Sequence, residues 1–106
     1  MTTLFHVTMI HSADNCPAYE REKMAEFIAM ADQLDARAKE LGVTVHNLLW
    51  GAPEHVAYAL LEADSLAAVS RFVFLFPMRQ EFRVTPVQHL QDVVATGKAI
   101  VAQAQP

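Results

Sequence analysis

Residues 43–62 have the sequence VTVHNLLWGAPEHVAYALLE, which contains two strand-like runs separated by a turn. The runs 43–50 and 55–62 are rich in β-branched, aromatic and other apolar residues. The Gly-Ala-Pro-Glu segment between them is typical of a turn. This stretch therefore predicts two strands that run in opposite directions and pair with each other.

The sequence on either side of this hairpin supplies the other elements. Residues 4–11 alternate like a strand, and apolar residues at helical spacing then continue to Gly42, which is expected to cap that helix. After the hairpin, Ser65 is expected to begin a short helix, and residues 81–85 form a fourth strand. Pro86 cannot donate to a strand ladder and marks this strand as a sheet edge, after which a last helix follows.

The predicted order is therefore βαββαβ with an extra C-terminal helix, in one domain spanning residues 1–106. This order indicates an α+β, ferredoxin-like fold whose four-stranded antiparallel sheet has the order 4-1-3-2. The helices cover one sheet face, and nothing in the chain covers the other. We therefore expect a homodimer in which two sheets enclose a partly polar chamber.

Composition excludes several classes of function. The 8 Lys and Arg residues against 12 Asp and Glu residues give a net charge of −4, which disfavours nucleic acid and anionic membranes as partners. The N-terminus has no signal-like apolar run, and a single cysteine cannot form an intrachain disulfide, so a cytoplasmic location is expected. The sequence has no phosphate-binding glycine loop or dinucleotide motif, so no nucleotide cofactor is expected.

Two segments resemble the ferredoxin-like dimeric α/β-barrel superfamily, which includes heme-degrading monooxygenases and small lactone isomerases. They are residues 60–66 (LLEADSL), between the third strand and the second helix, and residues 82–87 (FRVTPV) in the last strand. The resemblance implies a homodimer with its ligand inside the barrel. The heme-degrading members use an Asn, a Trp and a helical His, but here the histidines fall on strands or their edges and the first strand has no Asn, so heme is not expected.

Three of the five histidines, His6, His46 and His89, are expected to lie near one another on the sheet. They are the candidate ligands of a transition metal, namely copper, zinc, nickel or iron. The alternative is that these are ordinary hydrogen-bonded strand histidines, because no short His-x-His spacing is present.

The register of the central hairpin leaves two arrangements open. If Trp50 pairs with His55, Ala57 and Ala59 share the face of His46 and leave room for an ion. If the pairing slips by one residue, Tyr58 and Leu60 take that face. His46, Trp50 and Tyr58 then line a pocket suited to an aromatic ligand.

Two further groups are candidates for chemistry. Arg83, together with Arg79, is expected to attract an anionic ligand, and surface solubility is the alternative role of these arginines. With the two aromatic residues above, the candidate cofactor-binding residues are Trp50, Tyr58 and Arg83. At the opposite sheet end lie the candidate catalytic residues His11, Cys16 and His55. Cys16 followed by Pro17 is typical of a helix start, where the helix dipole favours a nucleophilic thiolate; an inert loop cysteine is the alternative.

These patterns predict a homodimeric domain that binds a small molecule or metal near His6, His46 and His89, as a small oxidoreductase or isomerase. The rival predictions are a non-catalytic module that binds or senses a metal or small molecule, and a dimeric scaffold with a filled core.

Overall fold

The computed structural model describes residues 1–104. It contains four strands, three α-helices and three short 3-10 helices. In chain order these are β1 (Thr3–Ile10), η1 (Ala13–Asn15), η2 (Pro17–Tyr19), α1 (Arg21–Leu41), β2 (Thr44–Gly51), η3 (Ala52–Glu54), β3 (Val56–Ala63), α2 (Leu66–Val73), β4 (Glu81–Val87) and α3 (Leu90–Ala104).

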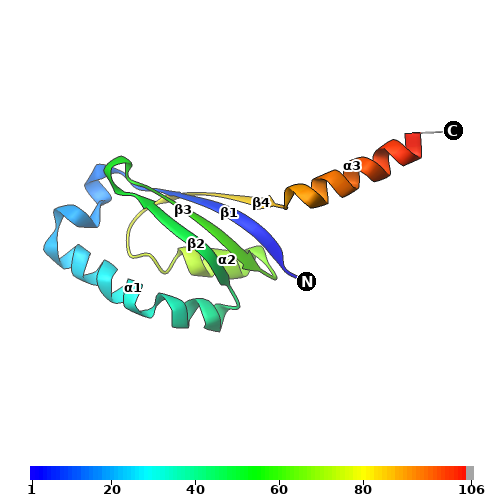
Figure 1. Ribbon diagram of the computed structural model, residues 1–106. Helices are drawn as coiled ribbons and strands as arrows, with labels where there is room; N and C mark the ends of the chain where they lie inside the picture. The colour runs from blue at the N-terminus through cyan, green and yellow to red at the C-terminus, as the bar shows by residue number, and fades with distance from the viewer. Residues whose placement is uncertain (105–106) are drawn as a thin grey trace.

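The strands form one antiparallel sheet in the order β2-β3-β1-β4. Helices α1 and α2 lie together on one face of this sheet (Figure 1). The βαββαβ order and the 4-1-3-2 sheet predicted from the sequence are confirmed, and the fold is ferredoxin-like. The Pro-containing strand β4 lies at an edge, where its missing N–H costs no ladder bond.

The core lies between the sheet and these two helices. Alternate residues of β1, namely Phe5, Val7 and Met9, face it, as period-two alternation requires. Leu61 of β3 and Phe72 of α2 meet them, and both are fully buried. This layer leaves the opposite sheet face, which carries His6 and Tyr58, uncovered by any described helix (Figure 1).

The hairpin register differs from both arrangements considered above. Trp50 pairs with Ala57, and a bulge between Val45 and Asn47 shifts the register further along β2. The connection has four residues, as expected, but it lies one position later in the chain: η3 and His55, which has a left-handed φ of 59°, lie between Gly51 and Val56. Ala57 and Ala59 therefore face the helices, so they leave no room beside His46.

Both predicted helix caps are present. Gly42 ends α1 in the left-handed conformation at φ 72°, and its N–H donates to carbonyls of the last helical turn. The Ser65 hydroxyl accepts a hydrogen bond from the Ala68 N–H at 3.1 Å and begins α2.

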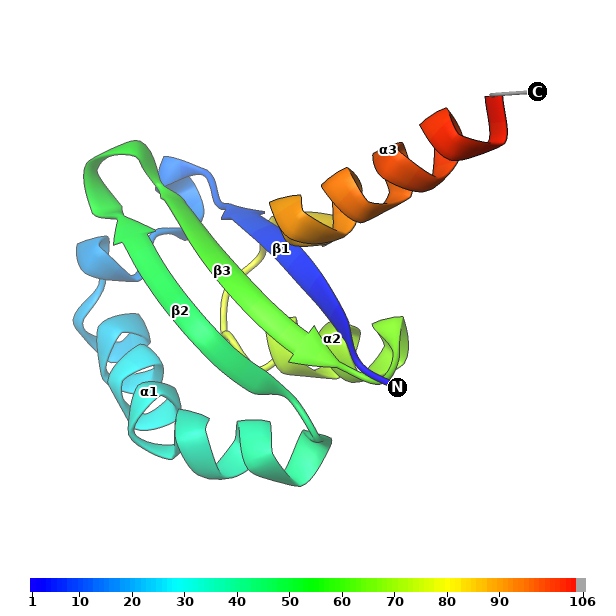
Figure 2. The same cartoon turned by 45° about the vertical axis from the view of Figure 1, so that its right-hand side comes forward.

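The last helix stands apart from this layered body. Helix α3 continues beyond the end of β4 and projects away from the sheet (Figure 2), which contributes to the molecule's longest extent of 67 Å. Within residues 1–104, no helix combines the length and apolar character needed to cross a bilayer. Several large apolar side chains of α3 are exposed: Leu90, Val93, Val94, Ile100 and Val101.

Candidate functional site

The fold brings His11, Cys16 and His55 together at one end of the sheet. His11 directly follows β1, and His55 directly precedes the neighbouring antiparallel strand β3. Cys16 lies between η1 and η2, where its N–H donates to the Ala13 carbonyl at 3.1 Å. The expected proximity of these three residues follows from this topology, because an antiparallel partner starts where its neighbour ends.

The two imidazoles meet through their ring nitrogens. His11 Nε2 lies 3.3 Å from His55 Nδ1, and the rings stand nearly edge to face with centroids 5.1 Å apart. With the Cys16 Sγ they form a group whose potential ligand atoms all lie within 4.8 Å of one another. The backbone fixes the histidine pair as well, since the His11 N–H donates to the His55 carbonyl at 3.1 Å.

His11 is a buried, neutral imidazole. His11 is only 5% exposed, and its Nδ1 has no hydrogen-bond partner within the described part of the chain. Burial lowers the pKa of His11 from its ordinary value, and the nearby His55 lowers this pKa further. Near neutral pH, His11 therefore offers a lone pair for a proton or a metal ion.

An apolar cavity of about 320 Å³ adjoins this group. His11 and Cys16 form part of its wall and supply its chemically reactive side chains. Trp50 and Phe27 pack edge to face, with centroids 5.2 Å apart, and form an aromatic part of the wall. The remaining lining residues are Pro17, Ala18, Met24 and Ala52.

Cys16 is the N-cap of a helical turn with Pro17 as its first residue, as the sequence suggests, but this turn is not part of the long helix. It precedes η2, a single 3-10 turn, and its side chain makes no cap hydrogen bond. Helix α1 begins later, at Arg21, after the N-cap residue Glu20. The 3-10 turn and one extended residue, Glu20, therefore separate Cys16 from the long helix, and a nucleophilic role for this thiol stays a prediction.

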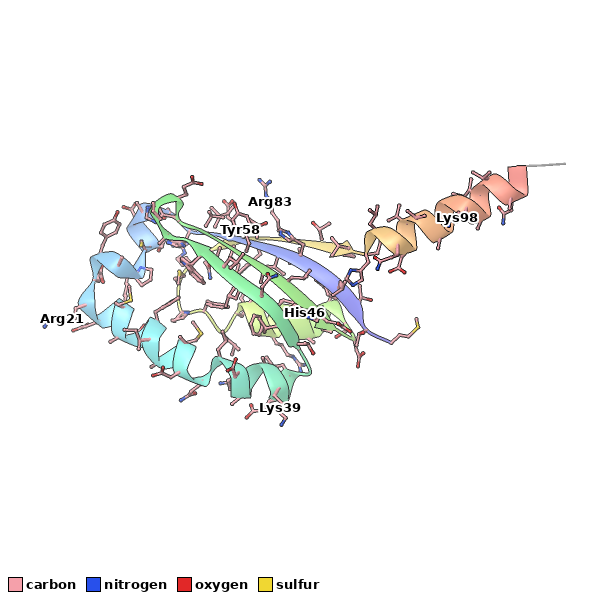
Figure 3. All side chains as sticks on the ribbon, in the orientation of Figure 1. Arg21, Lys39, His46, Tyr58, Arg83 and Lys98 are labelled. Atoms are coloured by element: carbon pink, nitrogen blue, oxygen red, sulfur yellow. The ribbon has the colours of Figure 1, made fainter. Side chains whose placement is uncertain are left out.

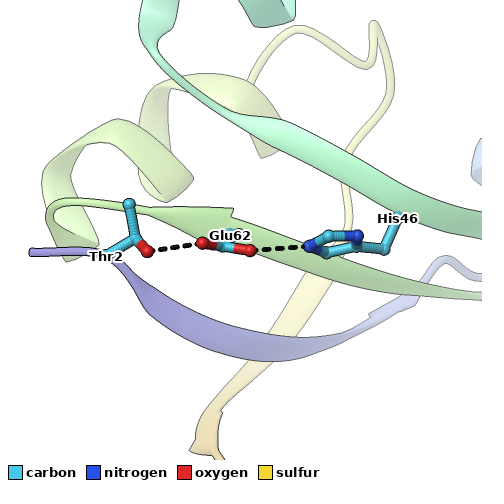
Figure 4. Close-up of polar contacts among 3 residues, drawn as sticks. All are labelled: Thr2, His46 and Glu62. Carbon is cyan, nitrogen blue, oxygen red and sulfur yellow. Dashed lines mark hydrogen bonds and ion pairs between the residues drawn. The ribbon is translucent and has the colours of Figure 1, made fainter.

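His46, one of the predicted metal ligands, is held by a carboxylate. Its Nε2 lies 2.8 Å from Glu62 Oε1, and the Thr2 hydroxyl donates to the other oxygen of Glu62 (Figure 4). The hydrogen bond from Thr2, and then the one from His46, lowers the pKa of Glu62 below its ordinary value. These three residues form a surface chain of polar contacts on the uncovered sheet face.

The other two predicted ligands lie on either side of this polar chain. His6 pairs with Leu60 and Thr85 on the neighbouring strands. His89 follows the end of β4 and lines a surface cavity together with Thr2 and Glu62, so it lies near the carboxylate that holds His46. A large Leu60 side chain, rather than an alanine, occupies the strand between His6 and His46. A metal site that joins His6, His46 and His89 stays a prediction.

The three predicted cofactor-binding residues fall on two faces. Trp50 faces the helices and the apolar cavity. Tyr58 and Arg83 lie on the uncovered face, both opposite Thr8 of β1, and Figure 3 shows their side chains directed away from α1. Trp50 pairs with Ala57, the residue next to Tyr58, so Trp50 and Tyr58 lie on opposite faces of the sheet and cannot line one pocket in a single protomer.

Sequence reasoning missed part of this site. Phe27 and Met24 are visible in the sequence only as the apolar stripe of a helix, and nothing local distinguishes a cavity wall from a filled core. The three-ligand group was also missed as a metal site, since its members are widely spaced along the chain. The available signal was the position of His11 and His55 at the adjoining ends of two neighbouring strands.

Comparison with curated proteins finds no match. Among solved structures, the chain is similar to a dimeric ferredoxin-like protein from an uncultured marine organism, at 12% identity and a TM-score of 0.47, over 85% of this chain and 95% of that one. It is also similar to a protein provisionally assigned as an antibiotic biosynthesis monooxygenase from Caulobacter crescentus CB15, at 16% identity and a TM-score of 0.47, over 82% and 91% of the two chains. The model of a family described as a domain of unknown function, DUF3303, matches residues 4–101, and the chain belongs to this family.

Proposed function

We propose that this chain is a homodimeric domain that binds a small, mainly apolar organic molecule in the cavity beside His11 and Cys16. The observation that carries the proposal is the cavity itself, whose volume of about 320 Å³ suits a molecule the size of a fused bicyclic ring. Its wall is apolar except at the two reactive side chains. This combination buries an apolar ligand and directs it toward a few polar groups.

The chemistry proposed for the site is that of a small isomerase or oxidoreductase. A neutral, buried imidazole such as His11 can accept a proton from a bound molecule, as isomerisation requires. Two imidazoles with a thiol can instead hold an ion that supports oxidation or reduction. A non-catalytic binding module would use the same cavity without turnover.

Homodimerisation is proposed because one protomer leaves much apolar surface uncovered. Leu49 is 61% exposed and Tyr58 is 41% exposed on the bare sheet face. Three strands of eight residues and one of seven present roughly 500 Å² in projection, and α3 adds roughly 220 Å². Together these approach the ~800 Å² per partner of a stable interface, so a second copy that covers both is the proposed occupant.

Fluorescence of the single tryptophan tests the ligand proposal directly. Trp50 lines the cavity, so 1-naphthol bound there will quench its emission in a saturable way. Ala52→Phe fills the cavity and is expected to weaken binding at least about tenfold. Ala67→Phe, on the exposed surface of α2, is the matched control and should bind as the unmodified chain does. Equal affinity in Ala52→Phe would place the ligand elsewhere and contradict the proposal.

A further inference from the structure

We propose that His11, Cys16 and His55 bind one transition-metal ion in tetrahedral coordination, with the fourth position open toward the apolar cavity. The inference deepens the proposed function and rests on it for the role of the open position. The ion is expected to be zinc or a metal with similar preferences, because the ligand set combines two imidazoles with a soft thiolate and contains no carboxylate.

The distance between the imidazoles fits shared coordination. Two nitrogens bonded to one tetrahedral ion at 2.0–2.1 Å lie about 3.3 Å apart. His11 Nε2 and His55 Nδ1 are 3.3 Å apart, whereas N–H hydrogen bonds are usually about 2.9–3.0 Å. The pair is therefore spaced as two ligands of one ion would be.

The thiol lies within reach of the same ion. A thiolate bound at about 2.3 Å lies about 3.6 Å from each nitrogen ligand of a tetrahedral ion. The three ligand atoms here all lie within 4.8 Å, so a small rotation of the Cys16 side chain completes the set. On binding, the thiol releases its proton to solvent, and the two neutral histidines bind through their lone pairs.

The surroundings of the histidines support this assignment. His55 has a left-handed φ of 59°, an uncommon conformation for a residue with a side chain and one that aims its ring at His11. His11 is buried, and when Nε2 binds an ion, Nδ1 carries the proton. Gln80 lines a second cavity together with His11, and its Oε1 is a buried acceptor without a partner among residues 1–104.

The position of the group gives the ion an access route. His11 and Cys16 both line the 320 Å³ cavity, so the side of the ion that faces away from the protein ligands opens into it. Three protein ligands and one open position are the arrangement of catalytic rather than structural zinc sites. The occupant of that position would be water or a polar group of the bound molecule.

Cobalt binding to the full, untagged chain tests the proposal. After treatment with a chelator, the protein should bind one Co²⁺ per chain and show the visible absorption of tetrahedral cobalt. A thiolate-to-cobalt charge-transfer band should appear in the near ultraviolet. Because Cys16 is the single cysteine, this band can come from no other residue.

Variants separate this site from the other histidines. Cys16→Ser should abolish the charge-transfer band and leave the thermal unfolding midpoint nearly unchanged, since the thiol makes no side-chain hydrogen bond at the 3-10 turn. His55→Asn replaces the ligand with a residue that also tolerates the left-handed conformation. It should weaken Co²⁺ binding by more than ~100-fold, because loss of a residue that only hydrogen-bonds to a metal ligand already weakens binding by up to that factor. His46→Ala, on the opposite sheet face, is the control and should bind normally.

Three outcomes would overturn the metal site: no stoichiometric cobalt binding, weak absorption typical of octahedral cobalt, or loss of binding in His46→Ala with normal binding in His55→Asn. Naphthol binding to the metal-free chain is measured in parallel. If naphthol binds while cobalt does not, the cavity proposal stands and the metal proposal fails. If cobalt binds while naphthol does not, the metal site stands without the proposed apolar ligand.

Discussion

Single residues on the two sheet faces have different kinds of partners. His11 is buried among apolar groups and meets another imidazole, whereas His46 lies near the surface against a carboxylate. The first setting lowers the pKa of His11 and favours its neutral ring. Two histidines of one sheet therefore suit different tasks, and only the first adjoins the apolar cavity.

The carboxylate of Glu62 gives a pH-dependent prediction at this scale. Hydrogen bonds from Thr2 and His46 lower its pKa in the folded chain, so its contribution to stability is complete above about pH 4.5 and is lost as the pH falls through the folded pKa. Thr2→Val should raise the pKa of Glu62 toward its ordinary value and reduce this acid loss. Carboxyl NMR titration measures the pKa, and urea unfolding below pH 4.5 measures the loss of stability.

Thr3→Val is the control for that titration, because Thr3 is exposed on β1 and, within the described residues, makes no side-chain hydrogen bond to Glu62. An unchanged Glu62 titration in Thr2→Val would mean that the hydroxyl does not stabilise the carboxylate.

At the scale of the element, capping residues determine where the helices end. Helix α1 ends at Gly42, whose left-handed φ of 72° turns the chain into β2. A Cβ atom at this position would have no neighbour within 4 Å. A side chain here would therefore be unfavourable because of the left-handed backbone conformation and not because of steric crowding.

Gly42→Ala is therefore expected to destabilise the chain by about 1 kcal/mol, the cost of a left-handed L residue. Gly97→Ala is the matched control: its Cβ also meets nothing within 4 Å, but it lies inside α3, where alanine favours the helix. Urea unfolding of both variants makes the comparison. Equal stability of Gly42→Ala and the unmodified chain would show that the cap conformation adds nothing.

At the scale of the whole molecule, the fold buries one sheet face and leaves the other bare. The same protomer extends α3 away from its body with apolar side chains exposed (Figure 2). Exposure of these two apolar surfaces to water is unfavourable. A second copy of the chain that covers both would remove this free-energy cost.

We therefore expect the chain to sediment as a dimer at micromolar concentration. Ending the chain after His89 removes α3 and should weaken dimerisation at least about tenfold, because much apolar surface is lost from the interface. Tyr58→Glu, on the bare face, should act in the same direction by placing a charge in the interface.

Ile28→Glu is the control for assembly, since Ile28 is an exposed apolar residue of α1, on the other side of the sheet. A full chain that remains monomeric, or a dimer that only Ile28→Glu disrupts, would show that the copies do not meet through their sheets.

Much of the fold could be predicted from local patterns. The alternation of Phe5, Val7 and Met9, the helical spacing up to Gly42 and the cap at Ser65 predicted element types and ends that the structure confirms. Chain-order rules then left one favoured sheet, because short antiparallel and right-handed crossover connections allow few arrangements. These features depend on interactions between residues that are close in sequence.

The site depended on contacts that local patterns do not encode. The turn that contains the left-handed His55 pairs Trp50 with Ala57, which places Trp50 by the cavity and Tyr58 on the other face. A shift of one residue in the pairing register moves every side chain of a strand to the other face of the sheet. A small change in loop geometry therefore changes the face on which the candidate ligands of that strand lie. His11, Cys16 and His55 meet because β1 and β3 pair, as the predicted strand order implied, but the distances between their ligand atoms could not be predicted from their spacing along the chain. The sequence was thus sufficient for the elements, their order and the grouping of His11, Cys16 and His55, whereas the tertiary structure alone decided which face each hairpin residue occupies and that a cavity adjoins this group, because both depend on loop geometry and side-chain packing.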